Sequence, residues 1–249
     1  MKKSLIHRAG KPGGHDTSPL LARQSIIRRS QIVLMLLLLL DLRLASAAPA
    51  AQEILASARL RVSQQEIDVQ GQLRENELIV PFRLTQTGPV VRYSFTNPDE
   101  ALQLRLGESD SKLEEITSAG VDKVSGPEFD HKVRGTAITY EDLALKFIYW
   151  PKANVLGEDY VNTRRVWKLE LQPPGRESQY SRVFVWCEQQ SGALMRMEGF
   201  DWNNRLVKRF EVISAQKIEG RWFLKQMRIE QLQPENGKLQ ARTYLEIKK

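Results

Sequence analysis

The stretch Gly135-Thr-Ala-Ile-Thr-Tyr-Glu-Asp-Leu-Ala-Leu-Lys-Phe-Ile-Tyr-Trp-Pro151 carries the strongest helical pattern in a chain that otherwise alternates like β-strands. Thr139 and Asp142 are spaced as a capping box, in which a hydroxyl and a carboxylate satisfy the first free backbone N–H groups of a helix. Pro151 disfavours helical geometry at the residue before it. The pattern therefore predicts a helix of about three turns, whose apolar face would consist of Tyr140, Leu143, Ala144, Phe147 and Ile148.

The apolar face of this predicted helix must be buried, and the rest of the chain offers only a sheet as its partner. Two interpretations of the helix remain open. In the first the helix fills a core. In the second it is a movable lid over an apolar cavity.

Period-two alternation, which is typical of half-buried strands, dominates on both sides of the helix. Four successive runs lie within residues 66–106, each with an apolar and a polar face. Further runs follow between Trp167 and Ile247, whereas residues 118–134 and 152–162 lack a period and are predicted to be loops. With a weaker run at Lys112–Thr117, the alternation predicts about eleven strands.

Two short helices, at Ala51–Leu60 and Tyr140–Trp150, cannot cover so many strands with one apolar face. Such a sheet must curl on itself. The predicted fold is therefore mainly β (α+β): a single curved antiparallel sheet of about eleven strands that forms an unclosed barrel, with short helices as a lid over an apolar cavity.

The first 47 residues have the order of a secretory signal peptide. A basic segment leads into the apolar run Ile32–Leu40, and the small-residue site Ala45-Ser-Ala-Ala48 follows. The apolar run spans only about 14 Å as a helix, against roughly 30 Å for a bilayer core. Arg28-Arg29 suggests twin-arginine export, but Gln31 and Ile32 match the usual continuation of that motif poorly, so we expect the general secretory route. We expect residues 1–47 to be cleaved, leaving 48–249 as a half-barrel domain that is soluble in the periplasm.

Most of the net charge lies in the segment expected to be removed. Residues 1–47 hold eight Lys and Arg and two Asp and Glu, so residues 48–249 keep 29 of 37 basic and 28 of 30 acidic side chains, a net charge of +1. This near-neutral remainder argues against nucleic-acid binding. Cys187 is the single cysteine, so an intramolecular disulfide is excluded, and we expect the thiol to be a core residue.

Side chains suited to catalysis or metal binding are sparse. His131 is the only histidine of residues 48–249, and with one cysteine it cannot form a His/Cys metal site. No nucleophile elbow or triad spacing accompanies it. The pairs Glu114-Glu115 and Glu141-Asp142 fit a solvated strand edge and a first helical turn. We therefore predict no catalytic residue, no cofactor and no metal, and the chain is not expected to be an enzyme.

Five short motifs lie within residues 139–210. They are Thr139-Tyr-Glu-Asp-Leu, Phe147-Ile-Tyr-Trp-Pro, Tyr180-x-x-Val-x-Val-Trp, Phe200-Asp and Leu206-Val-Lys-Arg-Phe. With these motifs the chain resembles, over roughly residues 50–249, the outer-membrane lipoprotein-sorting family, the LolA/LolB-like periplasmic lipoprotein carriers and their uncharacterised relatives. The resemblance implies an unclosed antiparallel barrel with a helical lid, and a cavity that receives lipoprotein acyl chains during transfer between membranes.

The resemblance leads us to expect a carrier of lipoprotein acyl chains or another lipid, for transport or sorting to the outer membrane. A membrane-bound donor or acceptor of the cargo would be its partner. The predicted lid contacts are Tyr140, Leu143, Phe147 and Ile148. The predicted cavity wall consists of the inward-facing residues Val80, Phe82, Tyr93, Phe95, Leu104, Trp167, Leu169, Met195 and Met197.

Two other classes of function remain open. A non-enzymatic envelope interaction module would hold its partner with a filled barrel and an exposed edge, and it would lack a cavity large enough for an acyl chain. An enzyme on this scaffold would need polar groups clustered inside the hollow, and the predicted inward positions are almost entirely apolar.

Overall fold

The computed structural model describes residues 49–63, 66–218 and 220–248, and the predicted signal peptide at 1–47 lies outside this part of the chain. The strands, in chain order, are β1 (Glu66–Glu75), β2 (Leu78–Thr87), β3 (Val90–Phe95), β4 (Glu100–Leu106), β5 (Ser111–Thr117), β6 (Gly120–Lys123), β7 (Lys152–Val161), β8 (Arg164–Gln172), β9 (Arg182–Glu188), β10 (Leu194–Phe200), β11 (Leu206–Ile218), β12 (Arg221–Leu232) and β13 (Leu239–Lys248).

Two α-helices and three 3₁₀ turns complete the described part of the chain. They are α2 (Ala51–Ser63), η1 (Gly126–Asp130), η2 (Val133–Gly135), α3 (Tyr140–Ala144) and η3 (Lys146–Tyr149). The predicted N-terminal helix is confirmed by α2. No helix in the described ranges is long and apolar enough to cross a membrane.

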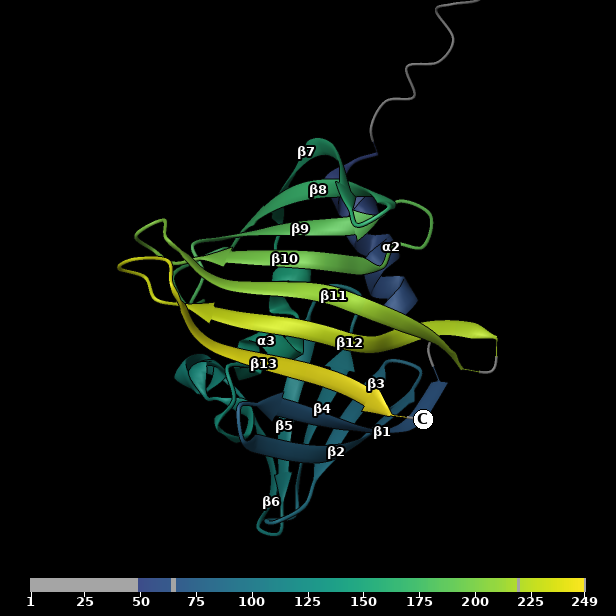
Figure 1. Cartoon of the computed structure of the whole chain (residues 1–249), viewed down its shortest axis with the longest axis vertical. Helices are drawn as coiled ribbons and strands as arrows, with labels where there is room; N and C mark the ends of the chain where they lie inside the picture. Colours follow the sequence, from purple (N-terminus) through teal and green to yellow (C-terminus); the bar gives the residue numbers. More distant parts are fainter. Residues whose placement is uncertain (1–48, 64–65, 219, 249) are drawn as a thin grey trace, which may run out of the picture. The chain divides into compact units, whose positions relative to one another are not determined.

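The strands form one antiparallel sheet in the order β6-β5-β4-β3-β2-β1-β13-β12-β11-β10-β9-β8-β7 (Figure 1). Within the described residues β6 and β7 each have a single neighbour, so the sheet is not closed into a barrel. The predicted fold class, a mainly β chain with one unclosed antiparallel sheet, is confirmed.

The structure has two strands more than the predicted eleven, and both lie at the edges of the sheet. β6 and β7 occupy the segments 118–134 and 152–162, which lack a clear sequence period. Every residue of β6 is exposed, and in β7 exposed residues alternate with half-buried ones up to Val161. An edge strand with so little buried surface needs no apolar alternation, so the pattern could not reveal it.

The sheet curls so that its two halves bury two apolar clusters, and α3 lies behind β12 and β13 in the view of Figure 1. The first core cluster joins β1–β5 to α3, β12 and β13, and includes Phe82, Phe95, Leu102, Leu104, Leu113, Tyr140, Ala144, Ile229 and Leu245. The second core cluster joins β8–β10 to α2 and η3, and includes Leu55, Phe147, Ile148, Trp150, Leu169, Tyr180, Val185, Cys187 and Met197.

Cys187 is fully buried in the second core cluster, which confirms the expected core role of this residue. Burial raises the pKa of its thiol to about 12. The thiol is therefore protonated and inert at neutral pH.

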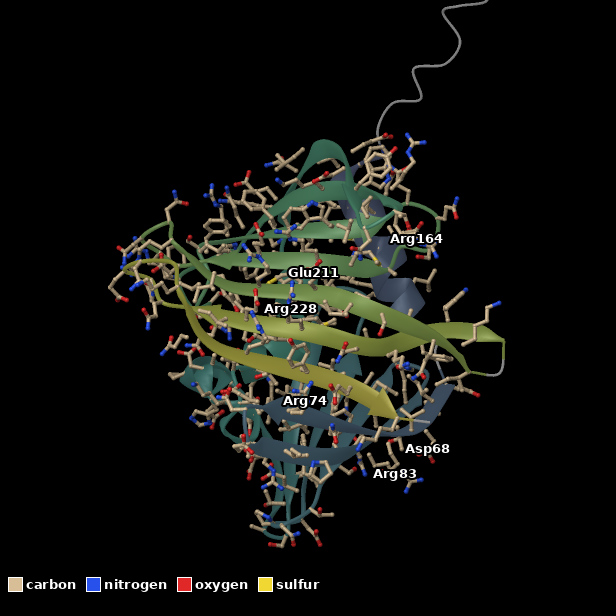
Figure 2. All side chains as sticks on the ribbon, in the orientation of Figure 1. Asp68, Arg74, Arg83, Arg164, Glu211 and Arg228 are labelled. Carbon is tan, nitrogen blue, oxygen red and sulfur yellow. The ribbon has the colours of Figure 1, made fainter. Side chains whose placement is uncertain are left out.

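The outer face of the sheet is covered by charged side chains rather than by a second layer. Arg228 and Glu211 pair at 2.6 Å across β11 and β12, and Arg83 and Asp68 pair at 2.5 Å across β1 and β2 (Figure 2). Trp186 of β9 has the ammonium of Lys168 4.9 Å from its ring centroid. The apolar surface that points outward is thus shielded by cationic side chains and their aliphatic stems.

Candidate functional site

The segment 135–151, which we call the crossover segment, forms two short helical pieces instead of the predicted three-turn helix. The capping box is formed as predicted: the Asp142 N–H donates to Thr139 Oγ1 at 3.3 Å, and the Thr139 N–H donates to Asp142 Oδ2 at 3.0 Å. The helix ends after Ala144 because Leu145 adopts the left-handed conformation, with φ 50° and ψ 35°. The Ala144 carbonyl is satisfied by the Ser111 hydroxyl at 2.9 Å.

The left-handed turn at Leu145 divides the predicted apolar face. Tyr140 and Ala144 pack in the first core cluster, whereas Phe147 and Ile148 pack in the second. The segment therefore joins the two halves of the core, and the expectation that one helical face carries all these residues is wrong.

Asp142 is the buried hub that fastens this segment to the sheet. The Tyr180 hydroxyl donates to Asp142 Oδ1 at 2.6 Å, and Lys208 Nζ of β11 lies 3.0 Å from Asp142 Oδ2. The two ion-paired side chains are 0% and 4% exposed. Lys208 Nζ also donates to the Ala137 carbonyl at 2.5 Å. Three of the five sequence motifs thus meet at one carboxylate.

Tyr180 is held in place by close packing as well as by its hydrogen bond. A Cβ added to Gly199 of β10 would lie 2.4 Å from the Tyr180 ring, so only glycine fits there. Burial first, and then the negative charge of Asp142, raises the pKa of Tyr180 well above its usual value. The phenol therefore stays protonated and keeps donating to Asp142.

Glu141 fastens the same turn to the loop between β8 and β9. Its carboxylate accepts from Ser178 Oγ at 2.5 Å and from the Gln179 N–H at 3.1 Å. Burial raises the pKa of the Glu141 carboxyl above its usual range. Gln179 Nε2 in turn donates to Thr139 Oγ1 at 2.7 Å, so the loop also supports the capping box.

The second half of the segment is fastened to α2. Arg59 donates to the Ile148 carbonyl at 2.6 Å, and its guanidinium lies 5.4 Å from the centroid of the Tyr149 ring. Gln52 Nε2 donates to the Trp150 carbonyl at 3.1 Å. Both pieces of the crossover are therefore anchored, α3 to the sheet and η3 to α2.

An apolar hollow with two lobes lies between the anchored segment and the sheet. The first lobe has a volume of about 200 Å³ and the second about 170 Å³. Small-molecule sites are typically about 300–1,000 Å³, so neither lobe reaches that range alone. The two lobes adjoin, because the same five residues line both of them: Tyr93, Leu143, Leu145, Leu224 and Leu245.

Polar side chains are few along the hollow. Asp142 and Arg196 border the first lobe, and Gln86 borders the second. Burial raises the pKa of Tyr93, which lines both lobes, to about 12. Among the described residues no group of three or more His, Cys, Asp or Glu is placed to hold a metal ion. The hollow is thus suited to an apolar ligand.

Six of the thirteen predicted site residues line the hollow, and seven do not. The six are Tyr93, Leu104, Leu143, Phe147, Met195 and Met197. The others pack in or against the two core clusters: Val80, Phe82, Phe95, Tyr140, Ile148, Trp167 and Leu169. The lipid-binding role of all thirteen remains a prediction.

Met195 and Met197 differ in their surroundings although they are two residues apart. Met197 is fully buried in the second core cluster, whereas Met195 packs against the small outer cluster of Val161, Val166 and Trp186. The pairing of β10 with β9 shifts register between Leu194 and Arg196, which breaks the alternation at Met195.

Sequence reasoning missed several residues of the site. Leu224 and Leu245 lie in correctly predicted strands, and the same alternation could have placed them on the inner face. Leu145 gave no signal, because it lies off the predicted helical face. The Asp142–Lys208 pair had a weak signal: Lys208 lies two residues from Leu206 and Phe210, and a charged residue at an inward strand position needs a buried opposite charge.

Several solved structures share this fold. A DUF1329 family protein from Desulfovibrio piger has a TM-score of 0.60 and 20% identity, over 81% of this chain and 92% of its own. A putative outer membrane lipoprotein-sorting protein domain from Vibrio parahaemolyticus has a TM-score of 0.61 and 17% identity, over 80% and 92%. A LolA superfamily protein from Nitrosomonas europaea has a TM-score of 0.58 and 17% identity, over 81% and 93%.

At these identities the likeness concerns the fold, which is the half-barrel that the sequence motifs imply. No curated protein matches the sequence. A family model described as an uncharacterized protein matches residues 118–249, more than half of the chain, from β6 through the crossover segment to the last strand. The chain therefore belongs to this family of uncharacterized proteins and has the fold of the LolA superfamily.

Proposed function

We propose that the protein is a periplasmic carrier that binds the acyl chains of a lipoprotein, or of another lipid, in the two-lobed hollow, for transport or sorting to the outer membrane. One observation carries the proposal: the hollow is lined almost entirely by apolar side chains and lies beneath a segment anchored at both ends. The fold shared with a lipoprotein-sorting domain and a LolA superfamily protein supports it.

Burial of acyl methylenes is the driving force of binding in this proposal. Each buried methylene contributes about 0.8 kcal/mol, so micromolar affinity, about 8 kcal/mol, requires about ten buried methylenes before the cost of association is counted. A longer chain requires the hollow to widen. Leu143 and Leu145 line both lobes and are only partly buried. We expect an entering chain to displace these two side chains while the flanking anchors hold.

Uptake of a fluorescent fatty acid by the purified protein tests the proposal. We expect saturable binding to the wild-type protein and its loss in Leu143→Asp, because a carboxylate between the lobes makes the hollow unfavourable for methylenes. Leu78→Asp is the matched control, since Leu78 is an exposed residue of β2 that lines neither lobe. Equal uptake by folded Leu143→Asp and Leu78→Asp would exclude the hollow as the binding site.

The small volume of each lobe favours one alternative, a filled barrel that serves as a non-enzymatic envelope interaction module. The same measurement separates the two functions. An interaction module takes up no fatty acid at any concentration below the solubility limit of the probe.

A further inference from the structure

The β11–β12 hairpin extends beyond the rest of the sheet. β10 pairs with β11 only as far as Glu211, and β13 pairs with β12 only from Gln226 onward. Among the described strands, residues 212–218 of β11 therefore have no partner in β10, and residues 221–225 of β12 have none in β13. We call these two stretches the arm. In Figure 1 the arm projects past the ends of β10 and β13.

The outer side of the arm exposes apolar and cationic side chains together. Trp222 is 56% exposed and Ile213 is 41% exposed. Lys217 lies directly opposite Trp222 in the β-pairing, and its ammonium is 5.3 Å from the centroid of the indole ring. A two-stranded ribbon is marginally stable in water, so apolar side chains exposed on it point to a partner surface.

The same arm also forms part of the hollow. Ile218, Phe223 and Leu224 line the second lobe, and Leu224 also lines the first. A partner surface that binds the exposed side of the arm would therefore lie close to the second lobe of the hollow.

The net charge of the arm indicates which kind of partner surface it would bind. The sequence of residues 212–225 contains three basic residues, Lys217, Arg221 and Lys225, and one acidic residue, Glu219. An indole prefers the boundary between the hydrocarbon and the headgroups of a bilayer, where its ring is in apolar surroundings and its N–H is hydrated. Clustered Lys and Arg are attracted to anionic headgroups.

We propose that the arm docks on the surface of a bilayer that contains anionic phospholipid, with Trp222 in the interface and Lys217 and Lys225 near the headgroups. The docked arm places the second lobe of the hollow beside the bilayer, where acyl chains enter or leave. This extends the proposed function, but docking is a property of the outer side of the arm and does not require the hollow to hold a lipid.

Co-sedimentation of the purified protein with vesicles tests the docking. The vesicles contain phosphatidylethanolamine with phosphatidylglycerol, and phosphatidylcholine vesicles serve as the zwitterionic comparison. We expect binding to the anionic vesicles that weakens as salt is added. Trp222→Ala should lose at least about tenfold in affinity, as expected when one large apolar side chain no longer inserts. Lys217→Glu should also weaken binding.

Matched controls come from the same chain. Trp202 is 42% exposed in the turn between β10 and β11, away from the arm, and Trp202→Ala should bind the anionic vesicles as the wild type does. Lys238→Glu, in the turn between β12 and β13, is the control for Lys217→Glu. All four variants alter exposed side chains, and within the described residues only Trp202→Ala also removes a hydrogen bond, from the indole N–H to the Ser178 carbonyl at 2.9 Å. Unchanged melting temperatures are therefore expected for the other three variants.

Three results would overturn the docking proposal. They are the absence of wild-type binding to anionic vesicles, equal binding by Trp222→Ala and the wild type, and equal losses in Trp222→Ala and Trp202→Ala. Fatty-acid uptake measured on the same variants separates the two proposals. Trp222→Ala should retain uptake, so a docking failure with intact uptake leaves the carrier proposal standing, and docking without uptake leaves the arm proposal standing.

Discussion

Replacement of Lys208 by methionine tests whether the buried ion pair fastens the crossover segment to the sheet. Methionine keeps an apolar stem of similar length and removes the ammonium. The variant loses the pairing with Asp142 and the hydrogen bond to the Ala137 carbonyl. Asp142 retains the Tyr180 hydroxyl and the Thr139 N–H, so its carboxylate stays buried with two donors and no cation nearby.

The size of the effect follows from the burial of both partners. Because Lys208 and Asp142 are 4% and 0% exposed, solvent does not screen the pair. Removal of one partner of such a buried pair costs about 3–5 kcal/mol of unfolding free energy. Domains are typically stable by about 5–15 kcal/mol, so Lys208→Met should still fold unless the wild-type stability lies at the low end of that range. Its melting temperature should fall by about 2–4 °C for each kcal/mol lost.

Urea denaturation monitored by tryptophan fluorescence measures this change. Lys238→Met is the matched control, since Lys238 is exposed in the turn before β13 and should change the unfolding free energy by no more than about 0.5 kcal/mol. The double variant Asp142→Asn/Lys208→Met removes both charges, and it should lose less than the sum of the single variants. A Lys208→Met protein as stable as Lys238→Met would refute the role of the ion pair as an anchor.

Three further changes test other parts of the account. Because burial raises the pKa of Glu141, this group stabilises the fold fully below pH 4.5 and less as the pH rises through the raised pKa. The unfolding free energy of Glu141→Gln, relative to that of the wild type, should therefore increase as the pH rises from 4. A difference that does not depend on pH would contradict this. Leu145→Gly should be less destabilising than Leu143→Gly by about 1–3 kcal/mol, since glycine relieves the left-handed turn but weakens a helix; equal losses would argue against strain at Leu145. Gly199→Ala should cost at least about 1–3 kcal/mol by thermal melting, because its Cβ meets the Tyr180 ring, whereas Gly175→Ala has open space and should be nearly neutral.

The sequence predicted those parts of the fold in which a strand buries one face. β1–β4 and the long strands β11–β13 have apolar side chains at alternate positions, because one side of each strand contacts the core. β6 and β7 bury little and pair on one side only, so no alternation marks them. The capping box at Thr139 and Asp142 was predictable because its chemistry is local.

The candidate site was less accessible to sequence reasoning, because tertiary contacts decide it. The helical pattern of residues 140–148 continues through Leu145, but the Ser111 hydroxyl and the two separate core clusters favour a turn there. An inward-facing residue can line a hollow or fill a core, and alternation does not separate the two. Phe82 and Tyr93 are both inward-facing, yet only Tyr93 lines the lobes.

The central claim is that the hollow holds acyl chains, and native mass spectrometry of the protein purified from its own envelope tests it most directly. Gentle activation releases a bound ligand while the protein stays folded. The account predicts a co-purified lipid or lipoprotein on the wild-type protein, and its absence from Leu143→Asp. A bare wild-type mass, together with no uptake of added fatty acid, would contradict the carrier function.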